Sequence, residues 1–167
     1  EQAVGLDFPE LGKDLNNGDI LLLDDGRIVL EVMRIEANKV YTQVQIGGPL
    51  SNNKGINLQG GGLSAAALTD KDRRDLLTAA NIGVDYIAIS FVRNAADMHE
   101  ARSLLDQANS SASLVAKIER AEAIEPTTLD GIIEASEAVM VARGDLAVEI
   151  GDAALVGVQK DIIKRAR

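Results

Sequence analysis

Residues 113–124 read SLVAKIERAEAI, and this stretch decides the fold. Ser113 to Ile118 is predicted to be a buried strand, with Lys117 and Glu119 two residues apart where it ends. Side chains alternate along a strand, so these two are expected to project to the same side. The carboxyl end of a strand is where parallel α/β folds bind ligands, so the pair is a candidate site.

Strands and helices alternate around this stretch from Thr69 onward. Thr69 and Asp72 predict a capping box for a helix that runs to about Asn81, with Gly83 as its stop. The predicted strands are VDYIAIS (84–90), SLVAKI (113–118) and EAVMVA (137–142). Further helices are expected from Asn94 with Asp97, from Glu122 and from about Asp152, with a short helical turn from Leu146. Such a series predicts a parallel sheet or barrel.

The first part of the chain has a different period. Residues 18–46 alternate with period two and predict an antiparallel meander, with turns at Asp24-Asp25-Gly26 and at EANK (36–39). Its last strand, 40–46, is expected to be half-exposed. Residues 47–62, GGPLSNNKGINLQGGG, are predicted to form a loop that ends in a hinge.

Composition excludes several classes of protein. The chain has 167 residues and a formal net charge of -9, with 2% aromatic residues and no basic stripe, which argues against nucleic-acid binding. No apolar run is long enough for a membrane span, and no secretion signal is seen at the start. There are no cysteines and a single histidine, His99, which is expected to be a solvated helix position. A metal would therefore have oxygen ligands, which favours magnesium, manganese or calcium.

The third strand ends in Arg143, Gly144 and Asp145, which brings a second carboxylate to the rim beside Glu119. Two carboxylates suit a magnesium ion that keeps positions open for substrate. Free N–H groups around Gly144 and Asp145 would attract a carboxylate or phosphate. Lys117 would stabilise an oxyanion or a phosphoryl group in transfer.

The candidate site residues also have plainer, non-functional interpretations. A Lys-x-Glu pair at a strand end is more often a surface salt bridge than a site. Asp24 and Asp25 fit turn chemistry better than contact with a nucleotide-bound metal. Lys54 lies in a glycine-flanked loop that could fold over phosphates, although a flexible surface lysine is the simpler interpretation.

Three stretches, in order, resemble the pyruvate kinase family, and the bacterial enzymes most. LVAKIERAEAI (114–124) is similar to its active-site signature and VMVARGDLAVEIG (139–151) to its second hallmark, while residues 50–76 are similar to the passage from the small B domain back into the barrel. Ala147 departs from the pattern, because the family usually has glycine there.

The resemblance implies an α/β fold, a partial (β/α)8 TIM barrel with an inserted small all-β lid domain. Residues 1–68 would be most of the β-rich lid (B) domain. Residues 69–167 would be about strands 4–6 of the barrel (A domain), truncated at both ends. Other phosphoenolpyruvate and pyruvate barrels, such as metal-dependent aldolases, lack a β-domain before the fourth strand.

By position in the family's motifs, the resemblance implies that Lys117 is the phosphoryl-transfer lysine and also binds substrate. Glu119 and Asp145 would be the ligands of Mg²⁺ or Mn²⁺. Gly144 and Asp145 would bind the substrate carboxylate through their backbone.

Two more residues have implied roles, Arg93 at the substrate and Lys54 at the nucleotide. The reaction implied is transfer of the phosphoryl group of phosphoenolpyruvate to ADP, giving pyruvate and ATP in glycolysis. Potassium would bind through residues missing from this chain. The intact protein is expected to be a cytoplasmic homotetramer. This chain alone is expected to be inactive, and the alternative is a non-catalytic fragment with residual nucleotide or metal binding.

Overall fold

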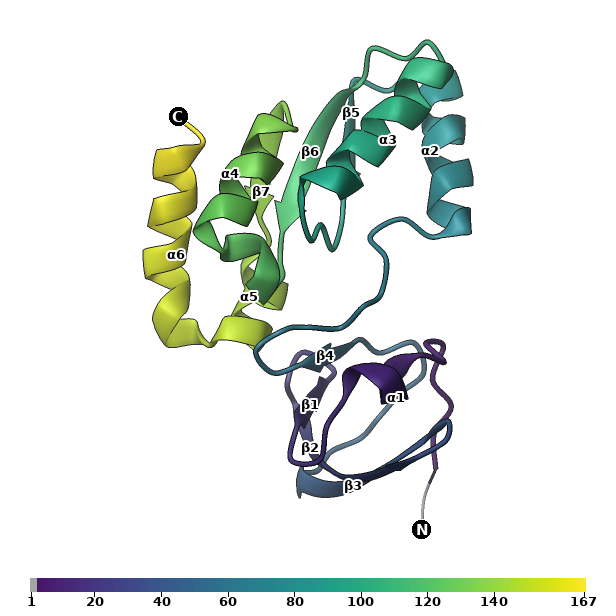
Figure 1. Ribbon diagram of the computed structural model, residues 1–167, viewed down its shortest axis with the longest axis vertical. Coiled ribbons are helices and arrows are strands. Elements are labelled where there is room, and N and C mark those ends of the chain that lie inside the picture. The colour runs from purple at the N-terminus through teal and green to yellow at the C-terminus, as the bar shows by residue number, and fades with distance from the viewer. Residues whose placement is uncertain (1–2) are drawn as a thin grey trace. The chain divides into compact units, whose positions relative to one another are not determined.

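The computed structural model describes residues 3–167 and divides the chain into two compact units, Glu1–Ala65 and Ala66–Arg167 (Figure 1). The first unit is an antiparallel sheet with one short helix. Its elements are α1 (Leu11–Asp14), β1 (Ile20–Leu23), β2 (Ile28–Glu36), β3 (Lys39–Ile46) and β4 (Ile56–Leu58). The strand order is β3-β2-β1-β4, so the predicted meander of β1, β2 and β3 is confirmed.

Two elements of the first unit were not predicted. Residues 47–62 are not all loop, because β4 pairs antiparallel with β1, with Leu21 opposite Leu58 and Leu23 opposite Ile56. A strand of three residues between glycines is too short to show a period of two. Helix α1 is only one turn long, and its Leu11 packs into the buried core of the unit.

The expectation that β3 is half-exposed holds only for its first half. Register shifts interrupt its pairing with β2, between Val29 and Leu30 and again between Val32 and Arg34. Val44, which lies between the two shifts, and Ile46, which lies past both, are exposed together with Gln45. Irregular pairing changes which side chains share a face, so strict alternation did not predict burial here.

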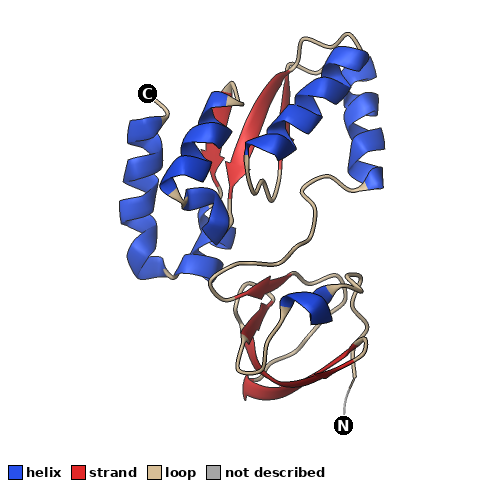
Figure 2. Ribbon diagram, viewed as in Figure 1, coloured by secondary structure: helices blue, strands red, loops and turns tan. Residues whose placement is uncertain are grey.

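The second unit confirms the alternating series. Its elements are α2 (Asp70–Ile82), β5 (Tyr86–Ile89), α3 (Ala95–Gln107), β6 (Ser113–Ile118), the 3₁₀ turn η1 (Ala121–Ile124), α4 (Pro126–Glu134), β7 (Ala138–Val141), α5 (Arg143–Ile150) and α6 (Asp152–Arg165). Strands β5, β6 and β7 form a parallel sheet in that order, and helices α3 and α4 lie across it (Figure 2). Within residues 3–167 this sheet has three strands and no closed barrel forms.

The two faces of the parallel sheet differ. Leu114, Ala116 and Ile118 of β6 are fully buried in the core beneath the helices. On the other face Tyr86 and Met140 remain 68% and 46% exposed. An apolar sheet face without a cover is what a section of a larger barrel leaves open.

Helix α2 begins as predicted. The Thr69 hydroxyl accepts from the Asp72 N–H, the Asp72 carboxylate accepts from the Thr69 N–H, and Gly83 ends the helix with φ +80°. Glycine suits that end because it adopts positive φ without a Cβ clash. No helix in the described residues is both long and apolar enough to cross a membrane.

Candidate active site

The site is built on the carboxyl end of β6. Lys117 and Glu119 project to the same side, with Lys117 Nζ 3.1 Å from Glu119 Oε2. Glu119 is only 1% exposed, so this is not the surface salt bridge that the plainer interpretation expected. A buried carboxylate is costly unless cations or hydrogen bonds compensate it, and the neighbouring strand supplies such groups.

Ser90 and Phe91, which follow β5, hold the pair. The Lys117 ammonium donates to Ser90 Oγ at 2.7 Å, and the Phe91 N–H donates to Glu119 Oε1 at 2.6 Å. Phe91 has φ +55°, a conformation that costs a non-glycine residue about 1–2 kcal/mol. Backbone strain of this kind collects at functional sites, where the surrounding contacts maintain it.

Neither of these two contacts was predicted from the sequence. Ile89 lies opposite Ala116 in the parallel register, so the next residue on each strand, Ser90 and Lys117, are neighbours at the rim. A hydroxyl in register with a lysine was the available signal. It could be used only once the pairing of the strands was known.

One oxygen of Glu119 is available for a cation. Within the described part of the chain, its Oε2 is buried and accepts no hydrogen bond, and the Lys117 ammonium lies 3.1 Å from it. A buried carboxylate oxygen without a hydrogen-bond donor needs an explanation, and an ion is one. Residues 3–167 hold no group of three or more acidic or histidine side chains placed around a metal. Magnesium commonly takes one or two carboxylates and completes its shell with water and substrate, so the donor set fits that ion.

Gly144 and Asp145 lie in the first turn of α5, directly after β7. The helix begins at Arg143, three residues before the predicted turn at Leu146. N–H groups in a first turn have no acceptor within the helix and carry its positive end, which favours anions. Gly144 is exposed, and a Cβ at that position would have no atom within 4 Å apart from its chain neighbours and the backbone of its own helix.

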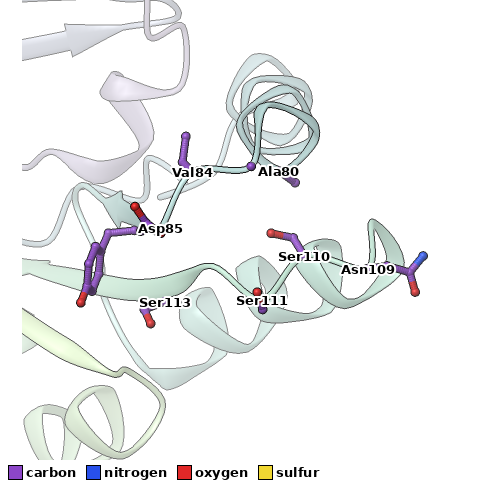
Figure 3. Close-up of a pocket in the computed structure, with 9 residues that line it drawn as sticks. Ala80, Val84, Asp85, Asn109, Ser110, Ser111 and Ser113 are labelled. Carbon is purple, nitrogen blue, oxygen red and sulfur yellow. The ribbon is translucent and has the colours of Figure 1, made fainter.

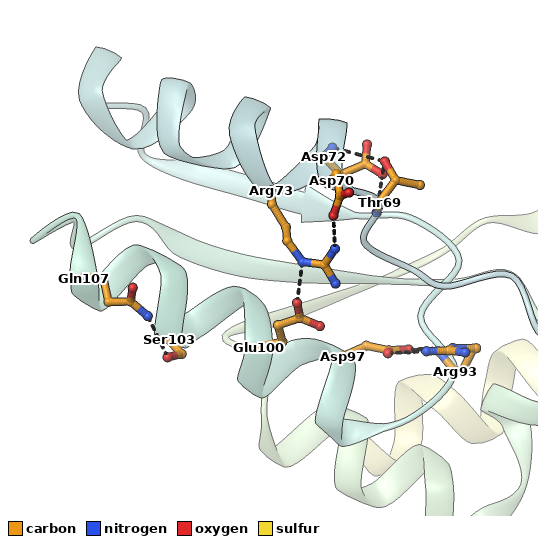
Figure 4. A network of polar contacts seen from close by, with 9 residues as sticks. All are labelled: Thr69, Asp70, Asp72, Arg73, Arg93, Asp97, Glu100, Ser103 and Gln107. Atoms are coloured by element: carbon orange, nitrogen blue, oxygen red, sulfur yellow. Dashed lines mark hydrogen bonds and ion pairs between the residues drawn. The ribbon is translucent and has the colours of Figure 1, made fainter.

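Arg93 is held by Asp97 at the start of α3 (Figure 4). Its Nη2 donates to Asp97 Oδ1 at 2.8 Å, while its Nε and backbone N–H donate to Oδ2 at 3.2 and 2.9 Å. Hydrogen bonding to Asp97 raises the pKa of Arg93. Burial works to raise the pKa of Asp97, but the hydrogen bonds from Arg93 outweigh it and the pKa is lowered. The cap that begins α3 is Asn94, which accepts from the Ala96 N–H, and hydrogen bonding from the Asn94 backbone also helps to lower the pKa of Asp97.

Lys54 belongs to the first unit, where its Nζ lies 2.7 Å from Asp24 Oδ1. That hydrogen bond lowers the pKa of Asp24. Asp24 and Asp25 have φ of 50° and 57°, which fits the turn role predicted for them. Lys54 is therefore paired with a carboxylate in the described structure.

The remaining features lie away from these residues. His99 is exposed on α3, as predicted. A hollow of about 540 Å³ lies where β5 and β6 begin, lined by polar groups that include Asp85, Ser110 and Ser113 (Figure 3). Lys117 and Glu119 are at the other end of β6, so the hollow is not part of their site.

A lysine, a buried carboxylate and a helix N-terminus at the carboxyl ends of adjacent parallel strands are typical of α/β enzymes that act on anionic, metal-bound substrates. Comparison with known proteins narrows this class. The family model described as "Pyruvate kinase, barrel domain" matches residues 1–167. The chain therefore belongs to the pyruvate kinase family.

Curated relatives agree with this assignment. The chain is 58% identical over 168 residues to a pyruvate kinase of Haemophilus influenzae and to pyruvate kinase II of Salmonella typhimurium. Each alignment covers 100% of the chain and 35% of the relative. It is 44% identical over 164 residues to a pyruvate kinase of Corynebacterium glutamicum, which covers 98% of the chain and 34% of that relative. The chain thus spans about a third of the length of these relatives.

Proposed function

We propose that the intact protein is a magnesium-dependent pyruvate kinase, which moves the phosphoryl group of phosphoenolpyruvate to ADP and gives pyruvate and ATP. The observation that carries the proposal is the Lys117–Glu119 pair, in which a buried carboxylate oxygen of Glu119 accepts no hydrogen bond. The family assignment and 58% identity to enzymes named pyruvate kinase support the same reaction.

Each residue at the rim has a role in this proposal. Glu119 and Asp145 would hold Mg²⁺ or Mn²⁺, which when bound neutralises charge on the substrate oxygens. The Lys117 ammonium stabilises negative charge on the phosphoryl group as it passes between the two substrates. Backbone N–H groups at Gly144 and Asp145 bind the carboxylate of phosphoenolpyruvate. The enolate that remains is protonated to pyruvate.

Arg93 and Lys54 are also proposed to bind the substrates. Arg93 lines the substrate site, with Asp97 holding its guanidinium in place. Lys54 contacts the nucleotide phosphates, and the ion pair with Asp24 keeps its side chain ordered before ADP binds. Potassium binds through residues outside this chain.

We assign residues 1–68 to a lid domain and residues 69–167 to about strands 4–6 of a (β/α)8 barrel. Closure of such a lid excludes water that would otherwise accept the phosphoryl group. The intact enzyme is proposed to be a cytoplasmic homotetramer.

The 167-residue chain alone is proposed to be inactive. Its parallel sheet has three strands in the described residues and one exposed apolar face, so the rim lacks the side chains that the other strands of a barrel would bring. Residual metal or nucleotide binding without turnover is the alternative activity of the chain by itself.

The test is steady-state pyruvate formation from phosphoenolpyruvate and ADP, coupled to lactate dehydrogenase, with the full-length gene product. Lys117→Ala should lower kcat by roughly 10³-fold, the scale of removing a preorganised charge from a transition state. Lys160→Ala, which changes an exposed lysine on α6, is the matched control and should leave kcat unchanged. A folded full-length protein that forms no pyruvate would refute the proposed reaction.

A further inference from the structure

Glu149 is a buried carboxylate that none of the proposed roles uses. It lies on α5, is 6% exposed, and its Oε2 accepts the Ala121 N–H at 2.7 Å. Ala121 begins the η1 turn, two residues after Glu119. This hydrogen bond therefore ties α5 to the chain that leaves β6.

Asp145 and Glu149 are four residues apart on the same helix. Side chains at this spacing lie on neighbouring turns of one face, and a helix is stiff over a single turn. A contact at Glu149 therefore fixes how far along its axis α5 sits relative to residues 119–121. The position of Asp145 relative to Glu119 depends on that placement.

The surroundings make this bond costly to lose. Arg120 is also buried, and its Nη2 lies 2.7 Å from Glu122 Oε1, so charged groups are packed closely under the rim. A carboxylate that accepts a backbone N–H makes a charge-assisted bond, which is stronger than a neutral one. Replacing Glu149 with alanine would leave the partly buried Ala121 N–H without this acceptor.

We propose that Glu149 is a positioning residue for the metal site: it holds α5 so that Asp145 and Glu119 can bind one divalent cation together. It acts through Ala121 and the helix, without touching substrate. The inference rests on the proposed function, because it takes Glu119 and Asp145 to be the ligands.

The test is direct binding of Mn²⁺ to the full-length gene product, followed by electron paramagnetic resonance of the free ion. Loss of a group that orients metal ligands typically weakens metal affinity by roughly 10–100-fold, and Glu149→Ala should do the same. Glu149→Gln retains a carbonyl oxygen that can accept the Ala121 N–H, so its affinity should stay closer to wild type than that of the alanine variant.

Glu137→Ala is the matched control. The Glu137 carboxylate also accepts a backbone N–H of β6, from Leu114 at 2.5 Å, but at the other end of the strand. This variant should bind Mn²⁺ as wild type does. Wild-type affinity in Glu149→Ala would overturn the inference. So would equal weakening in Glu137→Ala, or a glutamine variant no better than alanine.

Glu119→Gln separates this inference from the proposed function. If wild type binds Mn²⁺ and Glu119→Gln does not, the ligand assignment stands, and the Glu149 variants then decide the positioning role alone. If wild type does not bind Mn²⁺, or Glu119→Gln binds it normally, the proposed metal site is wrong and the positioning role falls with it.

Discussion

Replacing Asp97 with asparagine tests how firmly Arg93 is anchored. Asp97 and Arg93 side chains are 8% and 29% exposed, and two guanidinium N–H groups and one backbone N–H reach the carboxylate. A hydrogen bond to a charged group is worth about 1 kcal/mol more than a neutral one, so two guanidinium bonds amount to roughly 2 kcal/mol. Water reaches part of Arg93, which reduces the expected loss to about 1–2 kcal/mol.

The loss should depend on pH. The pKa of Asp97 is lowered in the folded state, so its contribution is fully present above the ordinary pKa of an aspartate, about 3.9, and is lost as the pH falls through the lowered value. Asparagine does not titrate. The stability difference between wild type and Asp97→Asn should therefore be constant from pH 6 to 8 and shrink below about pH 4.

The assay is thermal unfolding of the full-length protein across this pH range. A domain of 150–250 residues loses about 2–4 °C per kcal/mol, so the melting temperature of Asp97→Asn should fall by roughly 2–8 °C at pH 7. Asp106→Asn, an exposed position on the same helix, is the control and should melt as wild type does. An equal difference in melting temperature at pH 3 and pH 7, or no difference at pH 7, would show that the charged Asp97 carboxylate does not stabilise the fold through Arg93.

Three other changes have definite expected outcomes. Lys54→Ala should raise KM for ADP and leave KM for phosphoenolpyruvate unchanged in steady-state kinetics. Lys39→Ala, at an exposed position, is the control and should change neither KM. Equal effects of the two variants would contradict a nucleotide role for Lys54. Ser90→Ala removes the hydroxyl that accepts a hydrogen bond from the Lys117 ammonium at 2.7 Å. Losing one charged hydrogen bond should lower kcat by roughly tenfold. An unchanged kcat would show that Lys117 does not need this hydrogen bond. Thr69→Ala removes the capping box of α2 and should cost about 1 kcal/mol in thermal or urea unfolding without any change in kcat, and wild-type stability would contradict the capping role.

The parts of the fold that could be predicted depend on local rules. The capping box at Thr69 involves residues three apart, and β6 has the predicted bounds, Ser113–Ile118, because a mainly apolar stretch ends at Ile118, next to Glu119. The same period of two predicted that Lys117 and Glu119 share a side.

The parts that were missed depend on contacts between distant segments. Strand β4 forms because Ile56 and Leu58 pair with β1, and the three residues of β4 themselves do not indicate that partner. The hydrogen bond between Lys117 and Ser90 depends on the register of β5 and β6, and the one between Ala121 and Glu149 depends on how α5 packs. Lys54 was expected to be a flexible surface lysine or a phosphate contact, and its pairing with Asp24 could not be seen because the two are 30 positions apart.

The proposed reaction depends on Lys117 acting in the transfer step itself. The most direct measurement is rapid-quench detection of ATP in a single turnover, with saturating phosphoenolpyruvate and ADP on full-length wild type and Lys117→Ala. Transfer should be roughly 10³-fold slower in the variant, and the affinity for phosphoenolpyruvate should change far less. Transfer at the wild-type rate, with only weaker substrate binding, would contradict this role of Lys117.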